Sequence, residues 1–200
     1  PAVFRAYLDS LEAARGSRAV SVRFKDKSHG WAHPWFTVQF ADGSVYTEDF
    51  NRTGYGRGFG MQLFLRPACA RCRYTSTSRP ADFTLADYWG LDEKLALPVE
   101  RDKGVSMVLV NSARGQAVFD ALSPRFGQVE RPLAEAVAGN PRLASPLKAN
   151  PRRAAFFAAF AALPFAEVEK RFLALPSLPY RAAAKVLTPA MKEKIRKLLK

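Results

Sequence analysis

The sequence predicts an α+β fold: a mixed, largely antiparallel sheet in the first half of the chain, helices packed on that sheet, and a helical C-terminal region. Two observations carry this prediction. Before position 50, apolar and polar residues alternate around the turn signal Asp42-Gly43, which is typical of strands joined by a hairpin. After position 112, helical spacing of apolar residues dominates, and prolines and glycines divide it into short segments.

The chain begins with an expected helix over residues 3–14. Apolar residues recur there at a helical period, and Gly16 follows as a stop signal. Three extended segments should then form an antiparallel module: residues 20–24, 36–40 and 44–47. Asp42-Gly43 predicts a two-residue turn between the last two segments, because both turn positions must tolerate positive φ.

The segment 51–60 is dense in glycine, which occupies every second position from 54 onward. We consider two interpretations of this spacing. A phosphate-binding loop is one, although the spacing fits neither of the usual nucleotide-binding fingerprints. A mobile loop is the other, and it is the expected structure.

The second half should contain one strand and a series of helices. Residues 105–110 form a continuous apolar run, which predicts a buried central strand. Ser112 is placed to cap the next helix, and Phe156, Phe157 and Phe160 should face the core from a later one. The expected helices cover residues 113–122, 133–137, a segment that Pro151 opens and Pro164 ends, 165–173, and a basic segment from Thr188.

Length and composition fit one globular core with a small appendage. The 200 residues are 48% hydrophobic and 12% aromatic, which is typical of a folded protein. We expect one domain over residues 1–175 and a basic helical tail over 176–200. No apolar run reaches the length of a membrane span, and there is no secretory signal. Two closely spaced cysteines do not form a secreted disulfide framework, so a cytoplasmic location is expected.

The formal net charge of +13 arises from 31 Lys and Arg against 18 Asp and Glu. One interpretation is that this charge reflects only an arginine-rich composition and a basic tail, without a functional role. The functional interpretation is that a basic surface attracts acidic partners, such as a phosphate-bearing flavin, a polyglutamate deazaflavin coenzyme or an acidic ferredoxin. The sequence has no nucleic-acid-binding signature, so nucleic acid rests on charge alone and is not the expected partner.

Cys69 and Cys72 are the only cysteines, and two residues separate them. Such a pair can ligate one metal or cluster, or oxidise to a disulfide. Four interpretations stay open: half of a [4Fe–4S] site, half of a zinc site completed by His29 and His33, a redox dithiol, or two ordinary cysteines. The polar, turn-like segment after Cys72 argues against the dithiol, which normally lies at the start of a helix.

Charged residues flank the cysteine pair on both sides. Arg66, Arg71 and Arg73 would favour thiolates and raise the reduction potential of an anionic cluster, unless they form an ordinary solvated basic loop. Asp82 and Asp87 follow in a short apolar segment and could be mistaken for an acid/base pair. An aspartate at the end of a short strand is, however, often a cap or a turn residue.

Three ordered segments carry a resemblance to a known family. They are R-P-x-C-x-x-C at 66–72, A-D-F-T-L-A-D-Y-W-G at 81–90, and K-G-V-S with the apolar strand that ends at Asn111. Residues 24–27 with 30–31, and 150–153 with 156–157, fit the same pattern. Together these segments resemble the C-terminal domain of the coenzyme F-420 hydrogenase/dehydrogenase beta-subunit family, a group of iron–sulfur flavoproteins.

The resemblance implies an oxidoreductase that moves electrons between FAD, [4Fe–4S] clusters and a soluble partner, either coenzyme F-420 or a ferredoxin. It implies that Cys69 and Cys72 ligate a cluster whose other ligands lie in a missing N-terminal, ferredoxin-like portion. We therefore expect this segment to be inactive alone. Similar bacterial proteins accompany polysaccharide biosynthesis, which implies a sugar-linked substrate. The alternative is a non-catalytic basic domain that docks an acidic protein or nucleic acid.

The resemblance also implies which residues lie near the flavin, although it identifies no catalytic residue. They are Thr84, Asp87, Trp89, Lys103, Gly104 and Ser106. Glycine permits close approach of the backbone, and the lysine can neutralise a flavin anion or a phosphate. Ala86 stands where glycine is common in the family, so its methyl group could restrict that approach.

Overall fold

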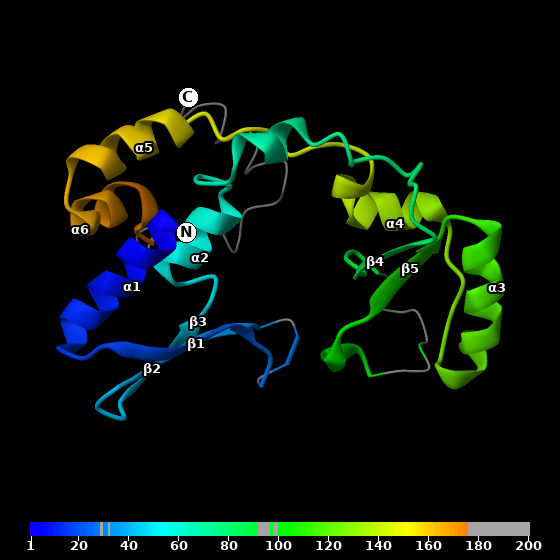
Figure 1. Ribbon diagram of the computed structural model, residues 1–200, viewed down its shortest axis with the longest axis horizontal. Coiled ribbons are helices and arrows are strands. Elements are labelled where there is room, and N and C mark those ends of the chain that lie inside the picture. The colour runs from blue at the N-terminus through cyan, green and yellow to red at the C-terminus, as the bar shows by residue number, and fades with distance from the viewer. Residues whose placement is uncertain (29, 32, 92–96, 98–99, 176–200) are drawn as a thin grey trace, which may run out of the picture.

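The computed structural model describes residues 1–28, 30–31, 33–91, 97 and 100–175. The described chain forms two lobes that two chain crossings connect (Figure 1). The first lobe holds α1 (Ala2–Arg15), β1 (Ala19–Asp26), β2 (Trp35–Phe40), β3 (Val45–Asp49), α2 (Gly54–Gly60), α5 (Arg153–Ala162), α6 (Phe165–Val168) and the π-helical turn η5 (Glu169–Leu173). The second lobe holds β4 (Phe83–Asp87), β5 (Ser106–Val110), α3 (Ala113–Leu122) and α4 (Leu133–Gly139).

The predicted α+β class is confirmed, with every described strand lying between positions 19 and 110. The expected last helix and the tail 176–200 lie outside the described residues. Within the part of the chain that is described, no helix has both the length and the apolar character needed to cross a bilayer.

The first lobe is built on an antiparallel sheet in the order β1-β2-β3. Phe36, Val38 and Phe40 alternate along β2 and are at most 2% exposed, because α1 covers this face with Tyr7 and Leu8. The predicted helix α1 is confirmed, and Gly16 ends it in the left-handed conformation at φ 65°.

The hairpin between β2 and β3 is confirmed, but its predicted two-residue turn is wrong. The Phe40 N–H donates to the Ser44 carbonyl at 2.9 Å, and the Gly43 N–H donates to the Phe40 carbonyl at 3.0 Å. Residues 41–43 therefore form the loop. Only Gly43 in this loop has a positive φ, at 84°, so the turn needs one permissive position instead of two.

The glycine-rich segment is a helix, so both interpretations of it from sequence were wrong. Thr53 caps α2, and its side chain accepts a hydrogen bond from the Gly56 N–H at 2.9 Å. A Cβ on Gly56 would lie 1.8 Å from the Phe50 carbonyl oxygen, and one on Gly58 would lie 2.7 Å from Leu173. Glycine is thus required because α2 packs very closely against its neighbours.

The C-terminal helices complete the core of the first lobe. The predicted break at Pro164 is confirmed between α5 and α6. Phe156 is fully buried and packs with Leu63, Val168 and Leu173, whereas Phe157 and Phe160 are partly buried around it. The predicted inner face of α5 is therefore confirmed.

The second lobe contains a two-stranded antiparallel sheet made of β4 and β5 among the described residues. Met107 is the one fully buried residue of β5, and it packs on Ala136 of α4 and on Leu143. The prediction of a buried central strand is wrong, because Val108 faces outward and is 37% exposed. The predicted cap of α3 is confirmed, since the Ser112 hydroxyl accepts from the Gly115 N–H at 3.0 Å.

Candidate functional site

The cysteine pair lies on the first of the two crossings between the lobes. Cys69 is inside a short 3-10 helix, η1 (Pro67–Arg71), and Cys72 is the residue that ends it. Both thiols are free and half-buried. Residues three apart on a 3-10 helix lie above one another, so this geometry suits two neighbouring ligands of one centre.

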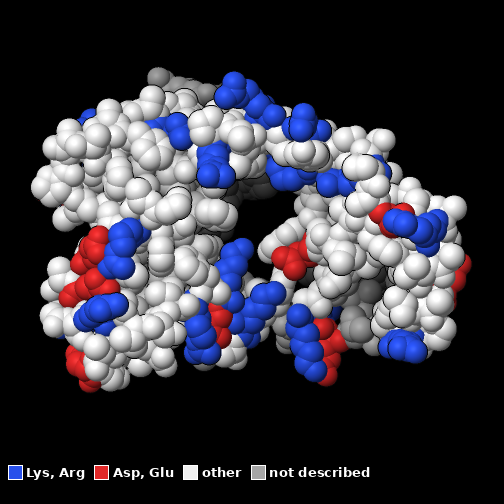
Figure 2. All heavy atoms as spheres, in the orientation of Figure 1, with Lys and Arg blue, Asp and Glu red and all other residues white. Residues whose placement is uncertain are grey.

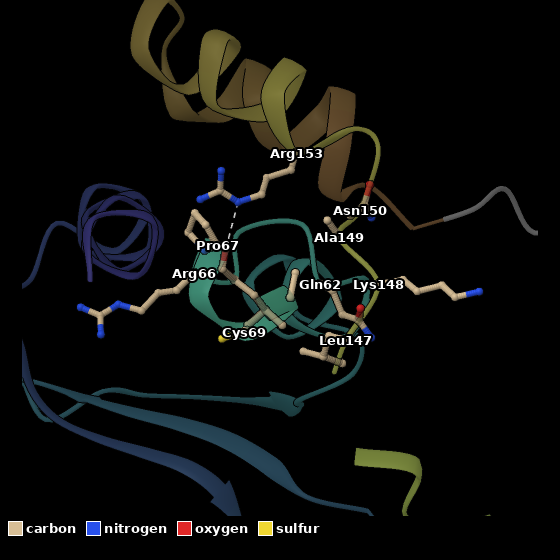
Figure 3. Close-up of a pocket in the computed structure, with 11 residues that line it drawn as sticks. Gln62, Arg66, Pro67, Cys69, Leu147, Lys148, Ala149, Asn150 and Arg153 are labelled. Atoms are coloured by element: carbon tan, nitrogen blue, oxygen red, sulfur yellow. Dashed lines mark hydrogen bonds between the residues drawn. The ribbon is translucent and has the colours of Figure 1, made fainter. Parts of the chain in front are cut away.

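Cys69 also lines a small pocket where the two crossings meet (Figure 3). The Asn150 amide donates to the Met61 carbonyl at 2.7 Å, and Arg153 donates to the Leu65 carbonyl at 2.9 Å. Arg66 and Lys148 point away from the pocket in opposite directions. The free volume is about 20 Å³, which is room for one water molecule. The segment 150–153 therefore fastens the second crossing to the backbone that leads into the cysteines.

The two crossings form a surface that we call the basic bridge, defined as residues 61–81 and 140–153. These segments contain no Asp or Glu. Figure 2 shows Lys and Arg side chains along this region without acidic neighbours on the face in view. The bridge carries eight cations: Arg66, Arg71, Arg73, Arg79, Arg142, Lys148, Arg152 and Arg153.

Thr84 and Asp87 lie on opposite faces of the β4–β5 sheet. Asp87 is opposite Ser106 in the ladder, and both side chains are exposed. Thr84 faces the side of the lobe's core, where its hydroxyl accepts from the Asn111 amide at 3.1 Å. The structure therefore brings Asp87 and Ser106 together but separates Thr84 from them.

Trp89, Lys103 and Gly104 meet near a loop of the first lobe. The Trp31 and Trp89 ring centroids are 4.4 Å apart, with the rings tilted by 38°. Gly104 has φ 84° and ψ 156°, and a Cβ there would lie 2.7 Å from Cδ1 of Trp31. Only glycine adopts this backbone conformation readily, so both the conformation and the close contact require it.

An open cleft between the lobes lies next to this contact. Its lining consists of Lys27, Gly30, Trp31, Glu100 and Lys103, and its volume is about 400 Å³. This volume is within the range of about 300–1,000 Å³ that is common for small-molecule sites. Figure 2 shows basic side chains on both sides of the hollow between the lobes.

Lys27 and Trp31 were not predicted as site residues. The signal available in the sequence was their place in the segments 24–27 and 30–31 of the family pattern. Their distance along the chain from Lys103 concealed that Lys27, Trp31 and Lys103 line one cleft.

Asp82 stabilises the second lobe and does not form an acid/base pair with Asp87. Its carboxylate accepts from the Ser112 hydroxyl and forms an ion pair with Arg114. The hydrogen bond from Arg114 is the main reason that the pKa of Asp82 is lowered. The aspartate therefore holds the start of α3 against β4.

The described residues contain no group of three or more His, Cys, Asp or Glu side chains that could hold a metal. His33 lies in the loop after β1, but His29 is outside the described residues. The zinc alternative needs both histidines, so the described residues do not include the complete set of ligands that it predicts. The cysteine pair supplies two thiolate ligands, as a shared cluster requires of one contributor.

Comparison with known proteins gives one match. The family described as the C terminus of the coenzyme F420 hydrogenase/dehydrogenase beta subunit matches residues 2–130. No curated protein and no solved structure matches significantly. The matched region contains the cysteine pair and all the residues of the cleft, whereas the segment 150–153 lies beyond it.

Proposed function

The chain belongs to the family of coenzyme F420 hydrogenase/dehydrogenase beta subunits, in their C-terminal part, and from this premise we propose that it holds cofactors in an iron–sulfur flavoprotein oxidoreductase. The family places the chain in the context of a redox enzyme. The cysteine pair on the basic bridge is the observation that carries the more specific proposal.

We infer that Cys69 and Cys72 supply two of the four thiolates of a [4Fe–4S] cluster. Their position on η1, half-buried and three residues apart, fits that role. The family description concerns the C terminus of a beta subunit, so we propose that the other ligands come from an N-terminal, ferredoxin-like portion of such a subunit. The domain of residues 1–175 would then be inactive without that portion.

We propose the cleft between the lobes as the FAD site. Lys103 lines this cleft, Trp89 and Gly104 contact Trp31 of the same lining, and Asp87 with Ser106 ends the adjacent sheet. A bound flavin accepts two electrons as a hydride and passes them on singly, which suits transfer between coenzyme F-420 and a cluster. The protein's own part is to stack on the ring, to balance anionic charge and to exclude water. Thr84 lies on the opposite face of that sheet from Asp87 and Ser106.

The basic bridge is the observation that favours an acidic redox partner, either a ferredoxin or an acidic coenzyme. Like-charged side chains without interspersed acids create a field that steers anionic partners toward the surface. The same surface would serve a non-catalytic docking domain, which is the competing function. The two functions differ in whether the cysteines bind iron.

The test is iron content in the intact protein after anaerobic reconstitution with iron and sulfide. Cys69→Ser and Cys72→Ser should each lower the bound iron strongly, because each removes one thiolate. Ser78→Ala, an exposed change on the same crossing, should leave iron unchanged. Full iron retention in both cysteine variants would reject the cluster assignment and favour the docking domain.

A further inference from the structure

We propose that Lys27 and Trp31 of the first lobe form half of the cofactor cleft, and that this cleft selects a planar ring linked to a phosphate. The inference rests on the proposed function, because it uses Trp89 and Lys103 of the proposed FAD site. It goes beyond that function by adding residues of the first lobe to the site. Both residues lie in segments that fit the family pattern, but neither is among the flavin contacts that the resemblance implies.

The ring would bind against the tryptophan pair. Trp31 covers part of Trp89, and the two ring centroids lie 4.4 Å apart, but Trp89 is still 49% exposed. An indole with an open face offers a stacking surface for any planar heteroaromatic ring. The cleft beside it is about 400 Å³, which is large enough for such a ring but open at its mouth.

The position of Trp31 is fixed by the second lobe. Gly104 allows the backbone to approach the indole so closely that a Cβ would lie 2.7 Å from it. Trp31 therefore lies between Gly104 and Trp89, although it belongs to the loop after β1. This arrangement joins the lobes at the cleft and makes the stacking surface depend on both.

The phosphate would bind between two lysines from different lobes. Lys27 and Lys103 both line the cleft. Lys103 pairs with Glu100 at 3.0 Å, but both side chains are more than 70% exposed. Such an exposed pair is weak, so the pyrophosphate of FAD, with one negative charge on each phosphate, can compete for the lysine. Asp26, the acid next to Lys27, is held by Arg23 at 2.8 Å.

The test measures the binding of two flavin probes to the intact protein by equilibrium dialysis. FAD carries the flavin ring, a pyrophosphate and an adenosine group, whereas riboflavin carries the flavin ring and its ribityl chain without phosphate. Lys27→Ala and Trp31→Ala should each weaken FAD binding about tenfold or more, the loss expected when one charged or stacking contact is removed. Lys27→Ala should leave riboflavin binding within about twofold, because the lysine contacts only the phosphate.

Two further variants serve as controls. Lys170→Ala removes an exposed lysine of η5 that does not line the cleft, and it should leave FAD binding unchanged. Trp31→Phe keeps an aromatic ring and should retain more FAD binding than Trp31→Ala, which separates stacking from a general loss of folding.

The outcomes separate this inference from the proposed function. Wild-type iron content with normal FAD binding in Lys27→Ala and Trp31→Ala would overturn the inference and leave the cluster intact. A protein that binds no iron, yet loses FAD in both variants, would overturn the cluster and support the cleft. Equal loss of riboflavin and FAD in Lys27→Ala would overturn the phosphate role of that lysine.

Discussion

Glu169 illustrates how one half-buried carboxylate affects the first lobe. It lies half-buried at the start of η5, and its Oε1 is 2.1 Å from the position that a Cβ on Gly54 would occupy. Burial raises the pKa of this carboxyl group, because a charged carboxylate loses water there. The folded state therefore binds the proton more tightly than the unfolded state does.

Because the pKa of Glu169 is raised in the folded state, its protonation stabilises that state fully at a pH below the ordinary pKa. This stabilisation is lost as the pH rises through the raised pKa. Glu169→Gln should therefore raise the melting temperature at neutral pH, and this gain should disappear on acidification to about pH 4. Thermal melts between those limits measure the effect. Glu167→Gln, an exposed change in α6, serves as the control and should follow the wild-type curve. A gain for Glu169→Gln that is the same at every pH would contradict the argument.

The residues of the candidate site were only partly predictable. Lys103 and Gly104 were proposed from their motif, and the structure places Lys103 in the lining of the cleft and Gly104 against Trp31. Trp31 lies in a segment that fits the family pattern, but the pattern does not reveal its contact with Trp89, which forms only when the two lobes meet. Thr84 was grouped with Asp87 by motif alone, while the strand's alternation turns the two side chains to opposite faces.

At the level of elements, α2 shows why a glycine can stabilise a helix. Gly56→Ala should destabilise the protein by about 1–3 kcal/mol, because its methyl group would overlap the Phe50 carbonyl and force the helix outward. Gly60→Ala is the matched change in the same helix. A Cβ there meets nothing within 4 Å, so alanine should be neutral or add up to about 1 kcal/mol. Denaturant unfolding measures both values, and equal effects would contradict the packing account.

The same helix marks the limit of prediction from sequence. α1 and α3 carry local signals, namely the stop at Gly16 and the cap at Ser112, and both could be predicted. The glycines of α2 have low helix propensity, and the sequence does not reveal that the Phe50 carbonyl and Leu173 leave no room for a Cβ at Gly56 and Gly58. The buried strand predicted at 105–110 failed for a related reason. Its apolar run does not reveal that the sheet has only two described strands and one covered face.

At the scale of the whole molecule, the basic bridge joins the two lobes and places the cysteine pair next to cations. Arg71→Glu should slow electron transfer with an acidic ferredoxin several-fold at low salt, because it weakens electrostatic steering. The difference should shrink as salt is added, since screening removes the steering in both proteins.

Arg125→Glu provides the control for this prediction. It makes the same charge change at an exposed position after α3, outside the bridge. Stopped-flow traces at several ionic strengths compare the three proteins. Equal slowing in both variants would show that net charge matters and the bridge does not.

The central claim is that this protein holds an iron–sulfur cluster and a flavin in one redox enzyme. The most direct measurement is the visible spectrum of the intact protein, purified without oxygen, together with its iron and flavin content. We expect flavin bands over a broad iron–sulfur shoulder, with about four iron atoms per chain for each cluster. A colourless protein without iron or flavin would contradict the claim and leave the basic bridge as a docking surface alone.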